Sequence, residues 1–174
     1  MTTLALPSVS AETQQTLTVL GRALFVATSF ETDCRMLALC LKLRDPFGDI
    51  GKSDEFERFI REPAVAKLAT NVSTIVAGMG LSKNYSDLLK DAREARNFIA
   101  HEAAEDLDQV FPVEEARIKW GASIDLKVRE VALGKLVVAM MLSKVSAIKA
   151  PDQVLLRTYL DQVSQWVLAF DSDA

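Results

Sequence analysis

His101 is the only histidine of this 174-residue chain, and it ends the run Arg93-Glu-Ala-Arg96-Asn97-Phe-Ile-Ala-His101. Histidine is the side chain best suited to transfer protons near neutral pH. The planar guanidinium of arginine stays charged and binds phosphate oxygens in pairs. An arginine and an asparagine followed closely by a histidine therefore suggest phosphodiester chemistry. We take Arg96, Asn97 and His101 as candidate catalytic residues and Arg93 as a candidate substrate-binding residue.

The spacing of this run predicts a single helix, in which each residue advances by about 100°. The core-facing stripe of that helix is predicted to consist of Leu88, Ala92, Ala95 and Ile99. Arg93, Asn97 and His101 are spaced by four and form a row on the other side. Arg96 lies near the edge of the core stripe and points away from His101. A site that contains both residues therefore needs a bend, a second segment or a second copy of the chain.

The plainer alternative is that this row is a solvated helix face. In that reading, His101 lies near a helix C-terminus, where the positive form of its ring is favoured. Short motifs of this kind also occur by chance.

Apolar periodicity along the chain predicts an all-α fold, an up-down bundle of about five helices in a single domain over residues 1–174. The predicted helices cover residues 11–44, a short stretch from 53, 64–77, a motif helix that Asn84 or Ser86 caps and that extends to about 104, 124–148, and 152–170. Residues 105–123 are predicted to form a long loop with short helical turns. The ends, 1–9 and 171–174, are expected to be flexible.

Composition limits the classes of function. With 49% hydrophobic and 25% charged residues, the chain is typical of a soluble globular protein. The net charge of −4 argues against a general nucleic-acid coat but allows a small basic site. Cys34 and Cys40 are expected to be reduced core residues of a cytoplasmic protein. Two cysteines and one histidine do not suit a zinc site, so no metal and no cofactor are expected. The most apolar stretches are too short to span a membrane.

The segment Arg96-Asn97-Phe98-Ile99-Ala100-His101 resembles the signature of the HEPN superfamily. That signature is an arginine, usually followed by a polar residue, and a histidine after four to six further residues, on a helix of a small all-α domain. The upstream segments 47–49, 67–82 and 85–89 resemble the mannitol-operon repressor-like branch. The resemblance covers roughly residues 40–105. One subgroup has a tyrosine two residues after the histidine, where this chain has Ala103.

The resemblance implies a metal-independent endoribonuclease of the toxin or defence type that acts as a homodimer. His101 would transfer the proton of the RNA 2′-hydroxyl, and Arg96, with Arg93, would stabilise charge on the phosphate. Asn97 would orient His101 or hold a phosphate oxygen. An antitoxin or a regulatory protein is a further expected partner.

The competing hypothesis is a non-catalytic dimerisation or regulatory module, similar to the repressor-like branch. Arg96 and His101 would then be hydrogen-bonded structural groups at an interface. The acidic residues Glu102 and Glu105 directly after the motif would repel RNA unless they face away from it.

Overall fold

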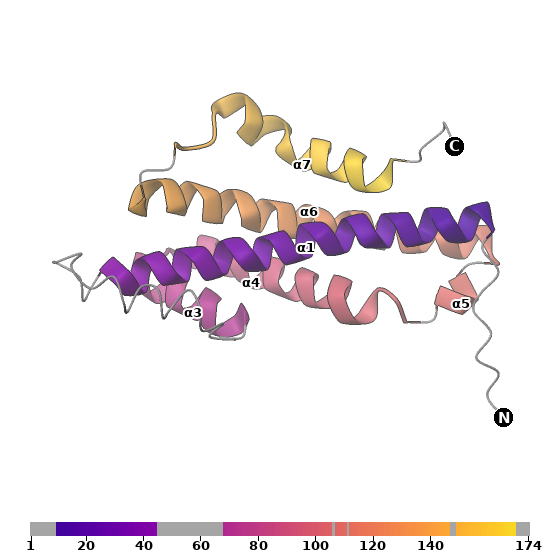
Figure 1. Ribbon diagram of the computed structural model, residues 1–174, viewed down its shortest axis with the longest axis horizontal. Coiled ribbons are helices and arrows are strands. Elements are labelled where there is room, and N and C mark those ends of the chain that lie inside the picture. Colours follow the sequence, from indigo (N-terminus) through magenta and orange to yellow (C-terminus); the bar gives the residue numbers. More distant parts are fainter. Residues whose placement is uncertain (1–9, 45–67, 106, 111, 147–148, 170–174) are drawn as a thin grey trace, which may run out of the picture.

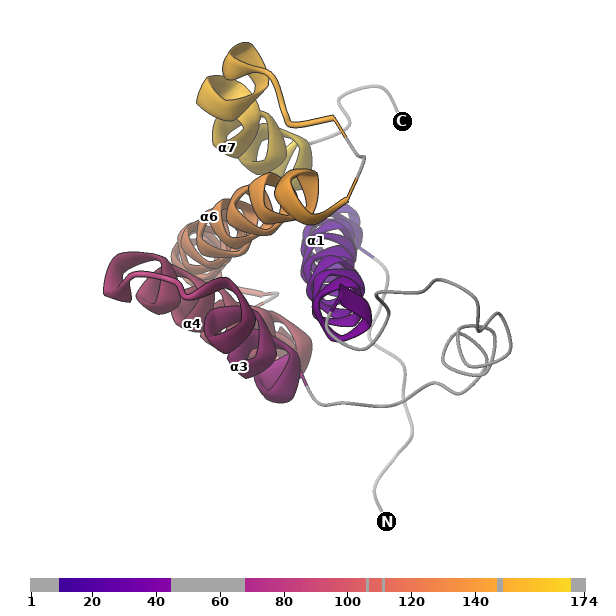
Figure 2. The ribbon, with the colours of Figure 1, turned by 90° about the vertical axis from the view of Figure 1, so that its left-hand side faces the viewer.

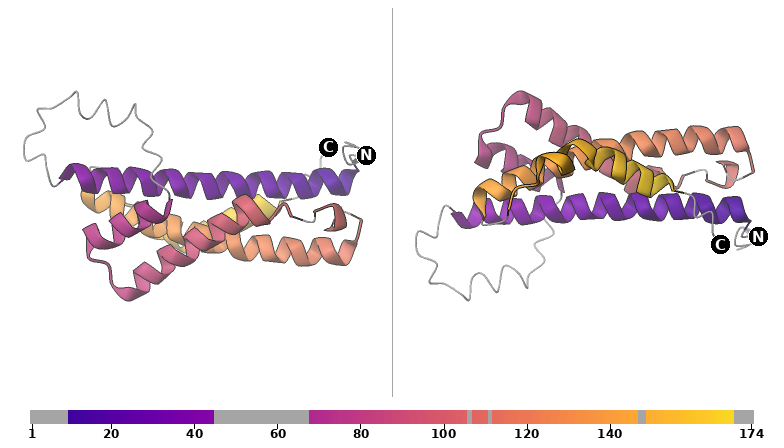
Figure 3. Two further views of the ribbon diagram at one scale, coloured as in Figure 1. Left: turned by 90° about the horizontal axis from the view of Figure 1, so that it is seen from below. Right: turned by 90° about the horizontal axis from the view of Figure 1, so that it is seen from above.

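A computed structural model describes residues 10–44, 68–105, 107–110, 112–146 and 149–169 (Figure 1). These residues form an all-α bundle, which confirms the predicted fold class. The long helices α1 (Ala11–Arg44) and α6 (Glu114–Val145) lie side by side. Helices α3 (Leu68–Met79) and α4 (Lys83–Asn97) cover one side of this pair, and α7 (Gln153–Leu168) covers the other (Figure 2). Helices α4 and α7 cross opposite faces of α6, while α1 forms one long edge of the bundle (Figure 3).

The core is densest where α1, α4 and α6 meet. Phe30 of α1 and Ala92 of α4 are completely buried, and both lie against Gly134 of α6. A Cβ on Gly134 would lie only 2.4 Å from the Ala92 Cβ and 3.0 Å from the Phe30 Cε2. Glycine at this position therefore allows the α4 backbone to approach α6 closely, and this approach places the end of α4 beside the middle of α1.

Local chemistry explains where the helices begin and end. The Ser10 hydroxyl accepts a hydrogen bond from the Thr13 N–H at 3.2 Å at the start of α1, and the Asp152 carboxylate accepts one from the Leu155 N–H at 2.7 Å at the start of α7. Helix α3 ends at Gly80, whose φ of +57° suits glycine. Helix α4 begins after Ser82, so the predicted cap at Asn84 or Ser86 is wrong.

The predicted loop over residues 105–123 is wrong in its second half. A short helix α5 (Leu107–Val110) is followed by α6, which begins at Glu114 rather than near residue 124. Glu114 and Glu115 lie in the first turn of α6, where the helix dipole favours acids. This end of α6 leaves Ile118 65% exposed, so its sequence lacks a clear apolar period. The helix predicted from residue 53 lies outside the described residues, as does the beginning of the one predicted over 64–77.

A polar network fastens α7 to α6. Arg129 of α6 binds the Asp125 carboxylate at 3.2 Å, Asp161 of α7 at 2.9 Å and the Ser164 hydroxyl at 3.2 Å. Ser164 is buried and also donates to Asp125. The hydrogen bonds that Arg129 donates to Asp161 and Asp125 raise the pKa of the guanidinium. The buried residues of α7 are Ser164 and Val167, and these polar contacts add to its attachment.

The cysteines agree with the sequence only in part. Cys34 is completely buried, as predicted for a core residue, while Cys40 is half-buried, and both are free thiols. Burial raises the pKa of the Cys34 thiol well above its ordinary value. Within the described part of the chain, no helix combines the length and the apolar character that crossing a membrane requires.

We expect Gly134→Ala to destabilise the protein by about 1–3 kcal/mol, because the added methyl overpacks the contact with Ala92. Gly121→Ala, also within α6, is the matched control, since a Cβ there meets nothing within 4 Å. The control should be neutral or stabilising by up to about 1 kcal/mol, as alanine favours helices. Urea unfolding of both variants measures the difference, and a Gly134→Ala variant as stable as the unmodified protein would contradict the packing described.

Candidate functional site

The helix that carries the motif changes its form just before His101. After Asn97, α4 passes into a π-helical turn, η1 (Phe98–Glu102). There the Ala103 N–H donates to the Phe98 carbonyl at 2.9 Å, a hydrogen bond that spans five residues instead of four. Single π-turns inside α-helices are rare overall, but many of those that occur lie at functional sites.

This wider turn brings Arg96 and His101 together. In a regular α-helix, residues five apart point about 140° away from each other. Here the Arg96 Nη1 lies 3.4 Å from the His101 Nε2. A bend, a second segment or a second copy of the chain could bring the two residues into one site. The structure has the first of these, a local departure from the straight α-helix. The prediction that they diverge therefore fails, because it assumed α-helical geometry up to His101.

Arg96 is held from two sides. Its Nη1 donates to the Asn97 Oδ1 at 3.2 Å, and its Nη2 forms an ion pair with the Glu31 carboxylate of α1. The Arg96 and Glu31 side chains are only 19% and 20% exposed. The Glu31 Oε1 also lies 3.6 Å from the Arg35 Nη2. Glu31 fixes the guanidinium, and no local sequence pattern predicts this contact, because Glu31 lies 65 residues upstream of Arg96.

The contact between Arg96 and His101 has one possible direction as a hydrogen bond. A guanidinium can only donate, so in such a bond the His101 Nε2 is the acceptor. His101 and Asn97 are exposed, whereas Arg96 is half-buried. The arrangement thus offers solvent an imidazole beside a fixed positive charge.

Two contacts hold the π-turn in place. Ile99 is buried in the core at 1% exposure, as predicted, and Ala103 at 2% closes the turn. The Trp120 Nε1 of α6 donates to the Ala103 carbonyl at 2.9 Å. Trp120, which was predicted to lie in a loop, is a residue of α6, and its hydrogen bond links the end of η1 to that helix.

Arg93 stands apart from the other candidates. Its guanidinium lies 3.7 Å from the Glu94 carboxylate, and no contact joins it to the Arg96–His101 pair. The Nε atoms of Arg93 and Arg96 are buried without a hydrogen-bond partner.

The core-facing stripe of α4 differs from the prediction by one residue at its start. Leu89 is completely buried, whereas Leu88, which was predicted to face the core, is half-buried.

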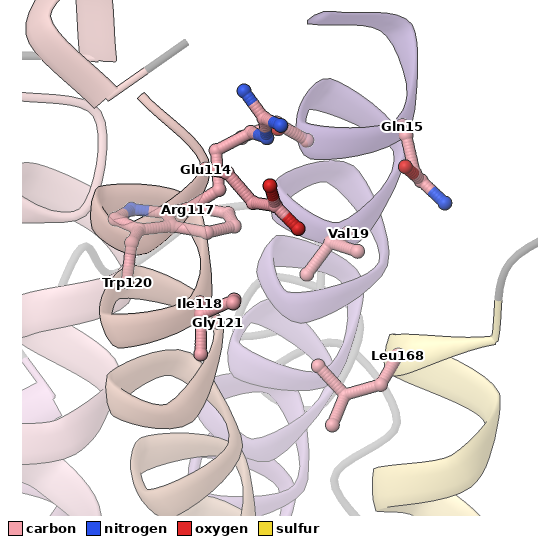
Figure 4. Close-up of a pocket in the computed structure, with 9 residues that line it drawn as sticks. Gln15, Val19, Glu114, Arg117, Ile118, Trp120, Gly121 and Leu168 are labelled. Carbon is pink, nitrogen blue, oxygen red and sulfur yellow. The ribbon is translucent and has the colours of Figure 1, made fainter. Parts of the chain in front are cut away.

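A groove of about 390 Å³ lies elsewhere in the molecule, and Trp120 is its link to the site (Figure 4). The groove is lined by Gln15, Thr16, Val19, Glu114, Arg117, Ile118, Trp120, Gly121 and Leu168. Neither Arg96 nor His101 contributes to it. The candidate site therefore lies outside this groove. Among the described residues, no group of three or more His, Cys, Asp or Glu side chains is placed to hold a metal ion.

A double-mutant cycle measures how strongly Glu31 holds Arg96. We expect Glu31→Ala and Arg96→Ala to show a coupling free energy of about 1–3 kcal/mol in urea unfolding, because both groups are largely shielded from solvent. The control pair is Glu115 and Lys119, whose side chains are 77% and 75% exposed. Its coupling should stay below about 0.5 kcal/mol. Equal coupling in the two pairs would contradict the constraint on Arg96.

Trp120→Phe should loosen the π-turn, since phenylalanine cannot donate to the Ala103 carbonyl. We expect a loss of about 1–3 kcal/mol of stability and a shift of the His101 ring signals in NMR spectra. Trp166→Phe serves as the control, because Trp166 is 46% exposed and lies on α7. Ring signals that stay unchanged in Trp120→Phe would show that Trp120 does not position His101.

Comparison of the chain with protein-family models, with curated proteins and with solved structures found no match in any of the three. The candidate site thus consists of an exposed histidine and an exposed asparagine around an arginine, which a glutamate of another helix holds.

Proposed function

We propose that this protein is a HEPN-like, metal-independent endoribonuclease. The observation that supports the proposal most directly is the 3.4 Å approach of the Arg96 Nη1 to the His101 Nε2 within one chain. An imidazole next to an arginine provides the base and the phosphate-binding group that cleavage of a phosphodiester bond requires. The resemblance of the Arg96–His101 segment to the HEPN signature supports the same reaction.

In this mechanism the nucleophile is the RNA 2′-hydroxyl itself. His101 accepts the hydroxyl proton at Nε2 while the 2′-oxygen attacks the neighbouring phosphorus. The bond from phosphorus to the 5′-oxygen breaks, the 5′-oxygen takes a proton from water, and a 2′,3′-cyclic phosphate remains. The protonated His101 then gives its proton to the hydroxide left by that water, which restores the base. Arg96 leaves its contact with His101 and donates Nη1 to a non-bridging phosphate oxygen, where negative charge grows. The Asn97 Oδ1 accepts a hydrogen bond from the same Nη1, and this contact limits where Nη1 moves.

Glu31 has a definite part in this mechanism. By binding Nη2 it keeps one edge of the guanidinium occupied and directs Nη1 toward solvent. The same carboxylate offsets part of the positive charge of Arg96, so RNA affinity should be modest. Glu102 and Glu105 are exposed close to His101 and weaken the attraction further. The proposal therefore includes a short RNA contact and no extended basic track.

The partners and the location are part of the proposal. We propose a homodimer, a single-stranded RNA substrate and an antitoxin or regulatory protein that controls the activity, all in the cytoplasm. Arg93 is proposed as a secondary phosphate contact, reached by substrate that extends along α4.

A non-catalytic dimerisation or regulatory module is the second candidate. It is favoured by the ion pair between Arg96 and Glu31, which joins α4 to α1 and gives the arginine a structural role. Under this hypothesis, His101 is a structural member of the polar cluster at the end of α4.

Cleavage of end-labelled RNA in the presence of EDTA distinguishes the two candidates. We expect the unmodified protein to produce 2′,3′-cyclic phosphate ends, and His101→Ala and Arg96→Ala to lower the rate by about 10²–10⁴-fold. Arg157→Ala, which removes an exposed arginine of α7, is the control for Arg96 and should leave the rate unchanged. Absence of cleavage, or equal cleavage by all four proteins, would reject the nuclease and favour the module. Thermal unfolding of each variant checks that the fold is intact.

A further inference from the structure

The groove shown in Figure 4 has one charged end and one apolar end. It lies between the first turns of α1 and α6 and the last residue of α7, Leu168. Glu114 and Arg117 lie at the end nearest the start of α6, and Leu168 lies at the opposite end, with Val19 and Ile118 between them. Its volume of about 390 Å³ falls within the range of small-molecule sites, roughly 300–1,000 Å³.

The apolar part of the groove is open to solvent. Ile118 is 65% exposed although it is a large apolar residue, and Val19 is buried beneath the opening. Gly121 lines the same space, and a Cβ added there would meet nothing within 4 Å. The indole of Trp120 provides an aromatic wall. Exposed apolar surface of this kind marks a place where an apolar group binds.

The charged end carries one charge of each sign. Glu114 and Arg117 are three residues apart on α6, so their Cβ atoms lie about 5–6 Å apart on one side of the helix. A guanidinium has five N–H donors, so Arg117 can bind a further carboxylate while it keeps its contacts within the chain. The neighbouring Glu115 and Lys119 pair with each other at 2.7 Å and do not line the groove.

We propose that this groove binds a free α-amino acid with a large apolar side chain, such as L-tryptophan. The ammonium group pairs with Glu114, the carboxylate pairs with Arg117, and the side chain lies against Trp120 and Ile118. An α-amino acid carries both charges on one carbon, which matches the close spacing of the two side chains. A phosphate ligand would instead meet the Glu114 carboxylate, and a purely apolar ligand would cover two charges without pairing them.

Trp120 connects this groove to the candidate site. Its ring lines the groove, while its Nε1 donates to the Ala103 carbonyl at the end of the π-turn at 2.9 Å. A ligand packed against the indole restricts its movement and therefore stabilises the turn that brings Arg96 and His101 together. The groove thereby regulates the same site, and this consequence rests on the proposed function, whereas the binding itself does not.

An NMR titration of isotope-labelled protein with L-tryptophan, up to about 5 mM, tests the binding without any RNA. We expect the methyl signals of Val19, Ile118 and Leu168 to shift with a Kd on the order of 0.1–1 mM, as suits a small ligand in an open site. Gly121→Leu fills the groove with a side chain and should abolish these shifts. Absence of shifts at about 5 mM, or equal shifts in Gly121→Leu, would overturn the site.

Two analogues of the same ring test the pairing of charges. Indole-3-propionate lacks the ammonium group and tryptamine lacks the carboxylate, so each should bind about tenfold more weakly than L-tryptophan. Glu114→Gln should weaken L-tryptophan about tenfold and leave indole-3-propionate within about twofold. Glu115→Gln, the adjacent exposed acid, is the matched control and should change neither affinity. Equal binding of all three ligands, or an unchanged affinity in Glu114→Gln, would overturn the amino-acid assignment.

The ring signals of His101 report the link through Trp120, and they are readily assigned because this is the only histidine. L-Tryptophan should shift them in the unmodified protein and not in Trp120→Phe, and it should raise the rate of RNA cleavage about fivefold. Equal His101 shifts in both proteins, or an unchanged rate in a protein that does cleave RNA, would overturn the regulation. A protein that cleaves no RNA would reject the proposed nuclease, while the methyl shifts decide the binding site by themselves.

Discussion

The arrangement of the site depends on one backbone hydrogen bond, from the Ala103 N–H to the Phe98 carbonyl. This bond widens the last turn of the motif helix and rotates His101 back toward Arg96. Without it, the two side chains would lie on different faces, and a joint site would need a second segment or a second copy of the chain. The bond forms because Ile99 is buried in the core and Trp120 binds the carbonyl of Ala103, so both ends of the turn are fixed.

The bundle provides the second constraint. Because Gly134 has no side chain, α4 lies close against α6, and its end comes beside the middle of α1. Glu31 then reaches Arg96 and holds one edge of its guanidinium. The same ion pair links two helices and orients the guanidinium that we propose binds phosphate. This double role is the reason that a catalytic and a purely structural interpretation both fit the cluster, and only the chemistry of the exposed His101 separates them.

The sequence predicted the parts of this molecule that follow from local periodicity. The bounds of α1, the burial of Ala92, Ala95 and Ile99, and the start of α7 at Asp152 all result from apolar spacing and capping residues. The first part of α6 was missed, because exposed residues such as Ile118 hide its period. The π-turn and the role of Glu31 were also missed. Both depend on contacts between segments far apart in the chain, and no local pattern encodes such contacts.

Scalar coupling across hydrogen bonds, measured by NMR on isotope-labelled protein, tests the central claim most directly. The account predicts a coupling between the amide nitrogen of Ala103 and the carbonyl carbon of Phe98, the two ends of the π-turn. A coupling from Ala103 to the carbonyl of Ile99 would instead indicate a regular α-helix, and it would contradict the pairing of Arg96 with His101 in one chain.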